Sequence, residues 1–336
     1  MVSKNLTWVI SRTPKQMASK IQHLTTALQN TRLLHDPEQT VETLLQEILN
    51  IIGKKMVMGV YGLHPGDEAK NIPFFEILRI RPNTSVSEVF SMRKEVSYKP
   101  QCYNTTYQRA STPKQTMFYG AIMDDRGSDI PARLTPTLEG VPWLRDKTSR
   151  GMQKVTYSRW VVKNDLNLIP VIFKPEYAGN AHVSKYLTQA IKSIYDNNPE
   201  FAEDILEFHH FIASEFSIPH TDSDNHNYLV TSIFTQMLIE KGKGQYDGII
   251  YPSCRVDGEA TNIAILPDAS ERLDLLVVGE CMIYKNGPQC IIKNLTISDS
   301  DGKTPLENFA LKKMEDELDE QQIFHDLGVD HLDYRA

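Results

Sequence analysis

The chain has 336 residues, of which 40% are hydrophobic and 24% charged, and its formal net charge at pH 7 is −7. These values are typical of a globular protein with one or two domains, and the acidic balance argues against nucleic acid as a partner. The chain has no apolar run long enough to span a bilayer, and its first residues lack the apolar core of a signal peptide. We therefore expect a cytoplasmic protein that does not bind membranes.

Metal ligands and disulfides are not predicted. The four cysteines have no CxxC spacing, which favours free thiols in a reducing compartment and neither a disulfide framework nor a zinc site. The loop His220–His226 carries imidazole and oxygen groups, but its spacing matches no standard metal site, so a polar surface loop is the better interpretation. His209 and His210 lie in a helical pattern and are interpreted as structural, one facing the core and one facing solvent.

Residues 1–55 are predicted to form two helices. Pro14 marks the start of the first, and the second runs from Glu38 to Ile52 with a stripe of apolar side chains at helical spacing. We interpret 1–55 as an N-terminal helical unit, either packed on the main domain or offered to a partner, which includes a second copy of the chain in a homo-oligomer.

The next part of the chain has the pattern of a β-rich domain. Strands are predicted at Met56–Tyr61 (or a turn), Phe74–Pro82, Thr116–Ile122, Gln153–Val162 and Asn167–Phe173. Alternation in the second strand places Leu78 and Ile80 on one face and Arg79 and Arg81 on the other, which indicates either a solvated face or an anion site. Pro170 should put the last strand at an edge or a bulge.

Helices return in an insert at about 175–227, and strands follow. The helices are expected at Ser184–Asp196, Pro199–Phe216 and Tyr228–Lys241; the later strands at Thr261–Leu266 and Leu273–Gly279, with a hairpin about Asn286-Gly287. Residues 306–336 are predicted to be an acidic helix with a tail. The fold class is therefore α+β, divided into 1–55, a domain at 56–298, and 299–336.

The stretch Asp247–Arg255 organises the chain. It contains an Asp-Gly turn, a short buried strand, and a Tyr-Pro-Ser end that places Ser253 at the lip of the strand with its hydroxyl exposed to a cleft. Alone, such a serine is more often a turn residue, just as Tyr119 alone is more often part of a core. No phosphate loop, dinucleotide fingerprint or GxSxG motif is present.

The segment Tyr246–Arg255 resembles the C-terminal motif of the RES domain family, which is named for an arginine, a glutamate and a serine. Its other motifs resemble Ile77–Arg81, an arginine (Arg109) before the aromatic strand Met117–Ala121, a glutamate, the strand Gly151–Trp160, and Asn262. The best match for the glutamate is Glu139, after a long loop, with Glu176 as its rival. The resemblance covers about residues 74–268, and Gln108-Arg109-Ala110-Ser111 departs from the Gly-Arg-x-Asn of the family.

The resemblance implies a mixed or antiparallel β core like that of ADP-ribosyltransferases, with an N-terminal helical extension and a helical insert. It implies NAD as the substrate, with cleavage of the nicotinamide–ribose bond and transfer of ADP-ribose to phosphate or water, in the manner of a NAD phosphorylase or glycohydrolase. Family members include toxins of toxin–antitoxin pairs, so an antitoxin or other partner protein and a toxin or defence role are also implied.

The same resemblance assigns roles to residues. Arg79, Glu139 and Ser253 are the expected catalytic residues, with Ser253 as a positioning group rather than a nucleophile. The residues expected to bind NAD are Arg81, Arg109, Tyr119, Tyr251 and Asn262. The alternatives are an ADP-ribosyltransferase that modifies a macromolecule, a pocket that binds a nucleotide without turnover, and a non-catalytic RES-like interaction module.

Overall fold

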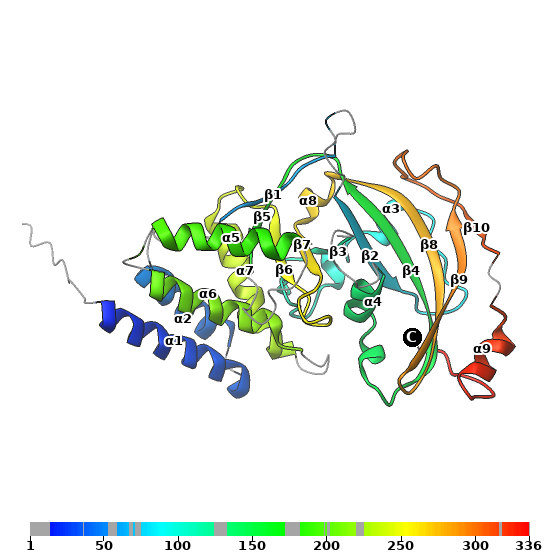
Figure 1. The fold of residues 1–336 in the computed structure, drawn as a ribbon, viewed down its shortest axis with the longest axis horizontal. Helices are drawn as coiled ribbons and strands as arrows, with labels where there is room; N and C mark the ends of the chain where they lie inside the picture. The colour runs from blue at the N-terminus through cyan, green and yellow to red at the C-terminus, as the bar shows by residue number, and fades with distance from the viewer. Residues whose placement is uncertain are drawn as a thin grey trace, which may run out of the picture.

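A computed structural model describes residues 14–35, 37–52, 59–66, 70, 75–123, 133–171, 182–197, 199, 202–219, 225–315 and 318–335. It is an α+β fold built on one ten-stranded mixed sheet (Figure 1). The strands are β1 (Tyr61–Leu63), β2 (Glu76–Pro82), β3 (Phe118–Ile122), β4 (Arg150–Val162), β5 (Leu166–Pro170), β6 (Gly248–Pro252), β7 (Thr261–Ile265), β8 (Leu273–Asn286), β9 (Gln289–Ser298) and β10 (Leu311–Lys313).

The longer helices are α1 (Pro14–Leu34), α2 (Glu38–Ile52), α5 (His182–Asn197), α6 (Ala202–Ser217) and α7 (Leu229–Lys241). Shorter ones are α3 (Arg93–Val96), α4 (Leu134–Gly140), α8 (Pro267–Ser270) and α9 (Glu320–Asp326), with 3-10 turns at Gln101–Tyr103, Pro142–Arg145 and Asn225–Tyr228. None of the helices in the described ranges combines the length and the apolar character needed to cross a bilayer.

The sheet has the strand order β1-β5-β6-β7-β3-β2-β4-β8-β9-β10, and its neighbours are antiparallel except for β5 and β6. The strand with Pro170 was predicted at an edge or a bulge, but β5 lies between β1 and β6. Proline is tolerated there because β1 pairs only with Leu166–Leu168, which leaves Pro170 beyond the end of β1. The strand is thus internal, while the proline itself lacks a partner on the β1 side.

The sheet opens into a fork between β2 and β3. These strands pair only at Ile77 with Ile122 and at Leu78 with Ala121. Beyond Leu78, β2 continues along β4 as far as Pro82, and β3 continues along β7. The two arms of the fork therefore separate in the middle of the sheet. There the backbone N–H and C=O groups on the facing edges of β2 and β3 border a gap and do not bond to each other.

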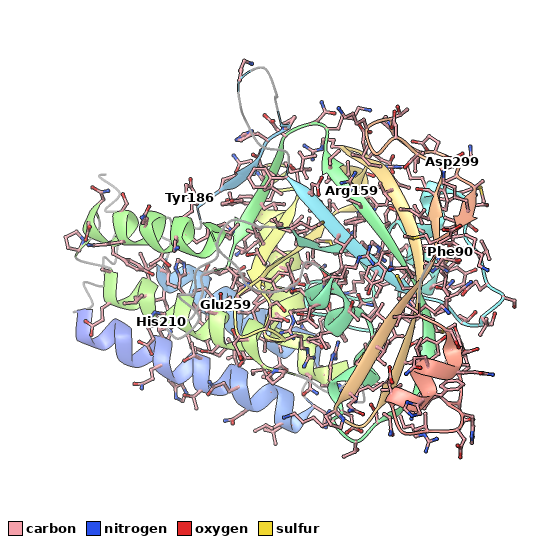
Figure 2. All side chains as sticks on the ribbon, turned by 45° about the vertical axis from the view of Figure 1, so that its right-hand side comes forward. Phe90, Arg159, Tyr186, His210, Glu259 and Asp299 are labelled. Carbon is pink, nitrogen blue, oxygen red and sulfur yellow. The ribbon has the colours of Figure 1, made fainter. Side chains whose placement is uncertain are left out.

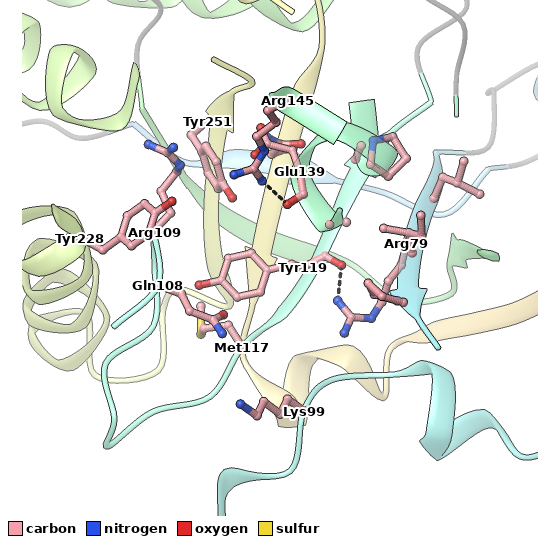
Figure 3. A pocket seen from close by; sticks show the side chains of 18 residues that line it. Arg79, Lys99, Gln108, Arg109, Met117, Tyr119, Glu139, Arg145, Tyr228 and Tyr251 are labelled. Carbon is pink, nitrogen blue, oxygen red and sulfur yellow. Dashed lines mark hydrogen bonds between the residues drawn. The ribbon is translucent and has the colours of Figure 1, made fainter. Parts of the chain in front are cut away.

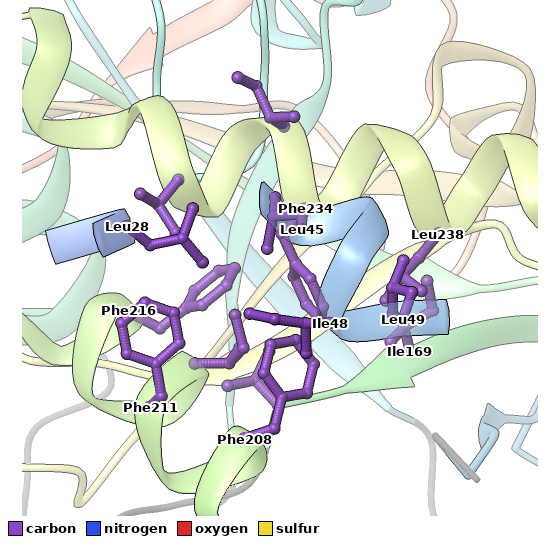
Figure 4. Packing of buried hydrophobic residues seen from close by; sticks show 14 of the residues in the cluster. Leu28, Leu45, Ile48, Leu49, Ile169, Phe208, Phe211, Phe216, Phe234 and Leu238 are labelled. Atoms are coloured by element: carbon purple, nitrogen blue, oxygen red, sulfur yellow. The ribbon is translucent and has the colours of Figure 1, made fainter. Parts of the chain in front are cut away.

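The long helices and one arm of the fork share an apolar core. α1 packs on α2 and α6, and α2 packs on α7. Figure 4 shows the side chains that meet between these helices and the sheet, among them Leu45 and Ile48 of α2, Phe208 of α6, Phe234 of α7 and Ile169 of β5. The N-terminal helices are therefore packed on the main domain; the domain boundary at residue 55 stays a prediction.

The other arm extends away from the helices. Figure 2 places Tyr186 of α5 and His210 of α6 on the helical side, and Phe90, Arg159 and Asp299 on the side of the long strands.

The prediction of one acidic helix over 306–336 is wrong in part, because Leu311–Lys313 pairs with β9 as an edge strand. Only α9, with its first turn capped by the Asp319 carboxylate, is helical in the described part of this segment.

Most sequence-predicted elements are present. α2 has the predicted bounds, β6 ends at Pro252, and β8 and β9 form the hairpin about Asn286-Gly287, with Gly287 at a φ of 60°. The β8 strand is longer than expected, because Leu273–Gly279 runs on without a break into the hairpin. Some predictions lie outside the described residues: those for 56–58, for Phe74, for Glu176 and for most of the 220–226 loop.

Candidate functional site

A cavity of about 370 Å³ occupies the fork (Figure 3). Both arms line it, together with α4 and the loop before β3. The lining residues used below are Arg79, Lys99, Gln108, Arg109, Met117, Tyr119, Glu139, Arg145, Tyr228, Tyr251 and Asn262. Its volume is within the range of ligand pockets, and both apolar walls and convergent polar groups are present. This is the strongest candidate for a functional site in the described part of the chain.

Glu139 places a carboxylate in this cavity. Its Oε1 accepts hydrogen bonds from Ser253 Oγ at 2.7 Å and from Asn262 Nδ2 at 2.9 Å, while Arg255 Nε lies 3.7 Å from Oε2. α4 packs on β2, whereas Ser253 follows β6 and Asn262 is on β7. The carboxylate therefore joins the two arms of the fork, and its three partners fix its orientation.

The chain positions Glu139 through α4 and its close packing on β2. A Cβ at Gly140 would lie 2.3 Å from Ile80 Cγ2, so glycine permits this approach. After the helix ends, Arg145 turns back and donates from Nε to the Leu138 carbonyl and from Nη2 to the Glu139 carbonyl, both at 2.6 Å. A guanidinium at the C-terminal end of a helix satisfies carbonyls that have no helical partner and is favoured by the helix dipole.

Arg79 bridges the fork from β2. Its Nη1 donates to the Tyr119 carbonyl at 2.8 Å and its Nε to the Ser97 carbonyl at 2.9 Å. The other N–H groups of its planar guanidinium can therefore bind a ligand. Burial, and then the charge of Arg81, lower the pKa of Arg79 to about 10. No carboxylate pairs with it in the described ranges. A half-buried cation without a protein counter-charge favours an anionic ligand.

Two tyrosines form the aromatic walls. The Tyr119 hydroxyl accepts from the Ala110 N–H at 3.1 Å and bonds with Ser111 Oγ at 2.6 Å, and burial raises the pKa of Tyr119 to about 12. Tyr251 is buried against Phe216, and burial raises its pKa well above its ordinary value. Both phenols are therefore neutral at physiological pH and serve as contact surface and hydrogen-bonding groups.

Three predicted residues are placed differently from expectation. Ser253 is fully buried, so the expected exposure of its hydroxyl is wrong: the strand end delivers it to Glu139 and not to open solvent. Arg81 does not line the cavity, because it stacks on Phe90 and donates to the Glu95 carbonyl. The predicted alternation still holds, with both arginines on the face opposite Leu78 and Ile80.

Arg109 lines the cavity, but its guanidinium is engaged elsewhere. It donates to the carbonyls of Phe216 (2.6 Å) and Ile218 (3.1 Å) at the end of α6, and to Cys254 Sγ at 3.3 Å. These bonds cap a helix of the insert. Arg109 therefore fixes the insert to the cavity wall, and its contact with pyrophosphate stays a prediction.

Sequence reasoning missed several residues of the site. Arg145 carries a usable signal, since an arginine shortly after a predicted helix is a common C-terminal cap. Arg255 ends the motif that singled out Ser253, but its spacing gives no hint that it faces Glu139. Lys99 and Tyr228 line the cavity without any local pattern. In the described ranges no group of three or more His, Cys, Asp or Glu is arranged to hold a metal ion.

Comparison with known proteins adds no assignment. No protein-family model matches the chain, and no curated protein matches it. A function for this chain therefore rests on the residues and geometry of the cavity in the fork.

Proposed function

We propose that this protein cleaves NAD at the nicotinamide–ribose bond, in the manner of the RES family, on a sheet of the ADP-ribosyltransferase type. The observation that carries the proposal is the pairing in one cavity of a fixed carboxylate, Glu139, with a half-buried guanidinium, Arg79, that has no carboxylate partner in the described ranges. NAD offers a cationic nicotinamide ribose and an anionic pyrophosphate, and these two protein groups have the complementary charges.

The residues have distinct roles in this reaction. The C1′–N bond breaks and its electron pair leaves with nicotinamide, which neutralises the pyridinium, while positive charge develops on the ribose. Glu139 stabilises that charge, and Ser253 and Asn262 hold its carboxylate. An oxygen of water or an anionic oxygen of phosphate then bonds to C1′, and where water is the acceptor its proton passes to solvent. No general acid is needed, because nicotinamide leaves as a neutral molecule.

Arg79 and the exposed cation of Lys99 give the cavity the positive charge that a pyrophosphate requires. Tyr119 and Tyr251 supply the aromatic surface for the nicotinamide or adenine ring. Arg81 is left out of this assignment because it does not line the cavity. Arg109 is left out because both of its terminal nitrogens already donate to protein groups, whereas Arg79 uses only Nη1 and Nε. A toxin or defence role would follow from the loss of cellular NAD.

The test is analysis of the products formed from NAD with and without inorganic phosphate. ADP-ribose, its phosphorylated form, and ADP-ribose attached to protein distinguish water, phosphate and a macromolecule as acceptors. Glu139→Gln should slow NAD loss by about 100-fold or more, because a neutral amide cannot stabilise the developing charge. Arg79→Met should raise KM roughly 10-fold to 100-fold through loss of a charged hydrogen-bonding partner.

The matched control is Glu307→Gln, the same change on an exposed carboxylate that does not line the cavity. It should consume NAD at the wild-type rate. If NAD survives intact in every condition with the folded wild-type protein, the proposal is wrong. If the wild-type protein consumes NAD and Glu139→Gln consumes it at the same rate, the protein is a NAD-cleaving enzyme but Glu139 is not its catalytic carboxylate.

A further inference from the structure

The 104–117 loop forms one wall of the cavity. Gln108, Arg109 and Met117 line it directly. The same loop fixes a second part of the wall, because the Ala110 N–H and the Ser111 hydroxyl hold the Tyr119 hydroxyl. The position of the aromatic wall therefore depends on where this loop lies.

The loop has little regular structure of its own. Its β-type pairing is limited to isolated bridges of Gln108 with Ser111 and of Thr112 with Gln115, and the Asn104 side chain donates to the Thr112 carbonyl at 2.7 Å. A segment with so few ladder bonds is held mainly by contacts with the rest of the molecule. Those contacts decide how firmly the wall is placed.

One carboxylate of the N-terminal helices binds the loop on both sides of Arg109–Ser111. Glu38, in the first turn of α2, accepts from the Tyr107 hydroxyl at Oε2 and from Lys114 Nζ at Oε1, each at 2.7 Å. Glu38 does not line the cavity. The side chain of Glu38 is 20% exposed and that of Lys114 is 66% exposed, so the bond from Tyr107 is the better shielded of the two from water and from salt.

The electrostatics of the three groups agree with this geometry. Burial alone would raise the pKa of Glu38, but the bonds from Lys114 and Tyr107 lower it below its ordinary value. The bond to Glu38 raises the pKa of Lys114, and burial followed by the same carboxylate raises that of Tyr107. Glu38 is thus ionised and both donors are protonated at neutral pH, which is the state that the two bonds need.

We propose that Glu38 is a positioning residue for the cavity: by holding Tyr107 and Lys114 it fixes the 104–117 loop, and through that loop the place of Tyr119. The N-terminal helices then act on a cavity that none of their described residues lines. The inference concerns the shape of the wall, and it rests on the proposed function only where NAD turnover is the readout.

The direct test is amide hydrogen exchange in the folded full-length protein. Glu38→Gln should speed exchange of the bonded amides of Gln108, Ser111 and Gln115 by roughly tenfold, because a charge-assisted bond is replaced by a neutral one. Tyr107→Phe removes a single O–H bond and should give a smaller increase in the same amides. The matched control is Glu47→Gln on the same helix, whose partner Lys20 lies 3.9 Å away at the surface; its exchange should equal that of the wild type.

Unchanged exchange in both Glu38→Gln and Tyr107→Phe would overturn the inference. Exchange that rises equally over the whole chain in both variants would also overturn it, since that marks global destabilisation and not release of one loop. This readout needs no substrate, so it decides the inference even if NAD proves not to be consumed.

Where NAD is consumed, the kinetics give a second readout. Glu38→Gln should raise KM for NAD about threefold to tenfold and leave kcat within about twofold, because the wall binds the substrate and the carboxylate of Glu139 is unaffected. A fall in kcat with KM unchanged would contradict a role in positioning the wall. Failure of the wild-type protein to consume NAD would count against the proposed function alone.

Discussion

The two arms of the fork have interiors of different composition. The helical half, with β6, β7 and β3, is held by a core of aliphatic and phenylalanine side chains. The half formed by β2, β4 and β8 has apolar clusters as well, but it also buries an ion pair: Lys154 Nζ lies 3.0 Å from Glu280 Oε1, and both side chains are less than 5% exposed. Thr296 also donates to Glu280, at 2.9 Å.

This difference matters because the two kinds of interior respond differently to substitution. Apolar packing is non-directional, and its loss scales with the atoms removed. A buried ion pair is stabilising only while both partners are present, since either one alone is an uncompensated charge. The Glu139 network crosses from one half to the other, so the site depends on both. The following predictions are ordered from the largest effect to the smallest.

Breaking the ion pair from one side should have the largest effect. Glu280→Leu leaves the Lys154 ammonium buried without a counter-charge and should lower the free energy of unfolding by about 3–5 kcal/mol. The double variant Lys154→Met/Glu280→Leu should recover most of that loss. Urea unfolding measures both. If the double variant is no more stable than the single one, the loss in Glu280→Leu does not come from an uncompensated charge on Lys154.

The helical half provides the contrast. Phe208→Ala should lower the free energy of unfolding by a similar 3–5 kcal/mol through cavity formation. A second truncation of its neighbour Phe234, whose ring centroid lies 6.0 Å away, should destabilise the protein further and not restore it. We therefore expect the second substitution to restore the free energy of unfolding in the half with the ion pair and to lower it further in the helical half.

The helical half also buries titratable groups, among them His209 of α6. Burial lowers the pKa of His209 to about 4 from an ordinary 6.5, and Tyr195 is its neighbour at 3.3 Å. His209 therefore takes up a proton more readily in the unfolded chain than in the folded one. The stability contribution is complete above about pH 6.5 and is lost as the pH falls toward 4, by about 3 kcal/mol for a shift of this size.

The measurement is the free energy of unfolding between pH 7 and pH 4 for wild type, His209→Leu and the half-buried neighbour control His210→Gln. His209→Leu should remove about 3 kcal/mol of the acid-induced loss, while His210→Gln should keep it. Equal pH slopes for all three proteins would show that His209 does not titrate between the folded and unfolded states as described.

The sequence anticipated elements that depend on local pattern and missed contacts that depend on distant packing. The apolar spacing of Glu38–Ile52 and the Tyr-Pro end of β6 each determine a local structure, and the structure has both. The fork could not be predicted, because nothing in β2 indicates that it leaves β3 after Leu78. Likewise Arg109 gives no sign that its donors bind the end of α6, at Phe216, 107 positions away.

The smallest effect is expected at the base of the fork. A Cβ on Gly120 would lie 2.4 Å from Ile77 Cγ2, across the last pairs that join the arms. Gly120→Ala should therefore lower the free energy of unfolding by about 1–3 kcal/mol. Gly59→Ala is the matched control, since a Cβ there would meet nothing within 4 Å. Equal stability of the two variants in urea would mean that the base of the fork yields without cost.

The crossing of the fork by the Glu139 network also bears on how the protein is synthesised. Glu139 is separated from Ser253 by 114 positions and from Asn262 by 123. Contacts of such separation form late, after local helices and hairpins. During translation the carboxylate has none of its three partners until the ribosome has passed Ser253, and it has all of them only after Asn262. The nascent chain can thus fold its N-terminal helices and first strands long before it possesses an assembled site.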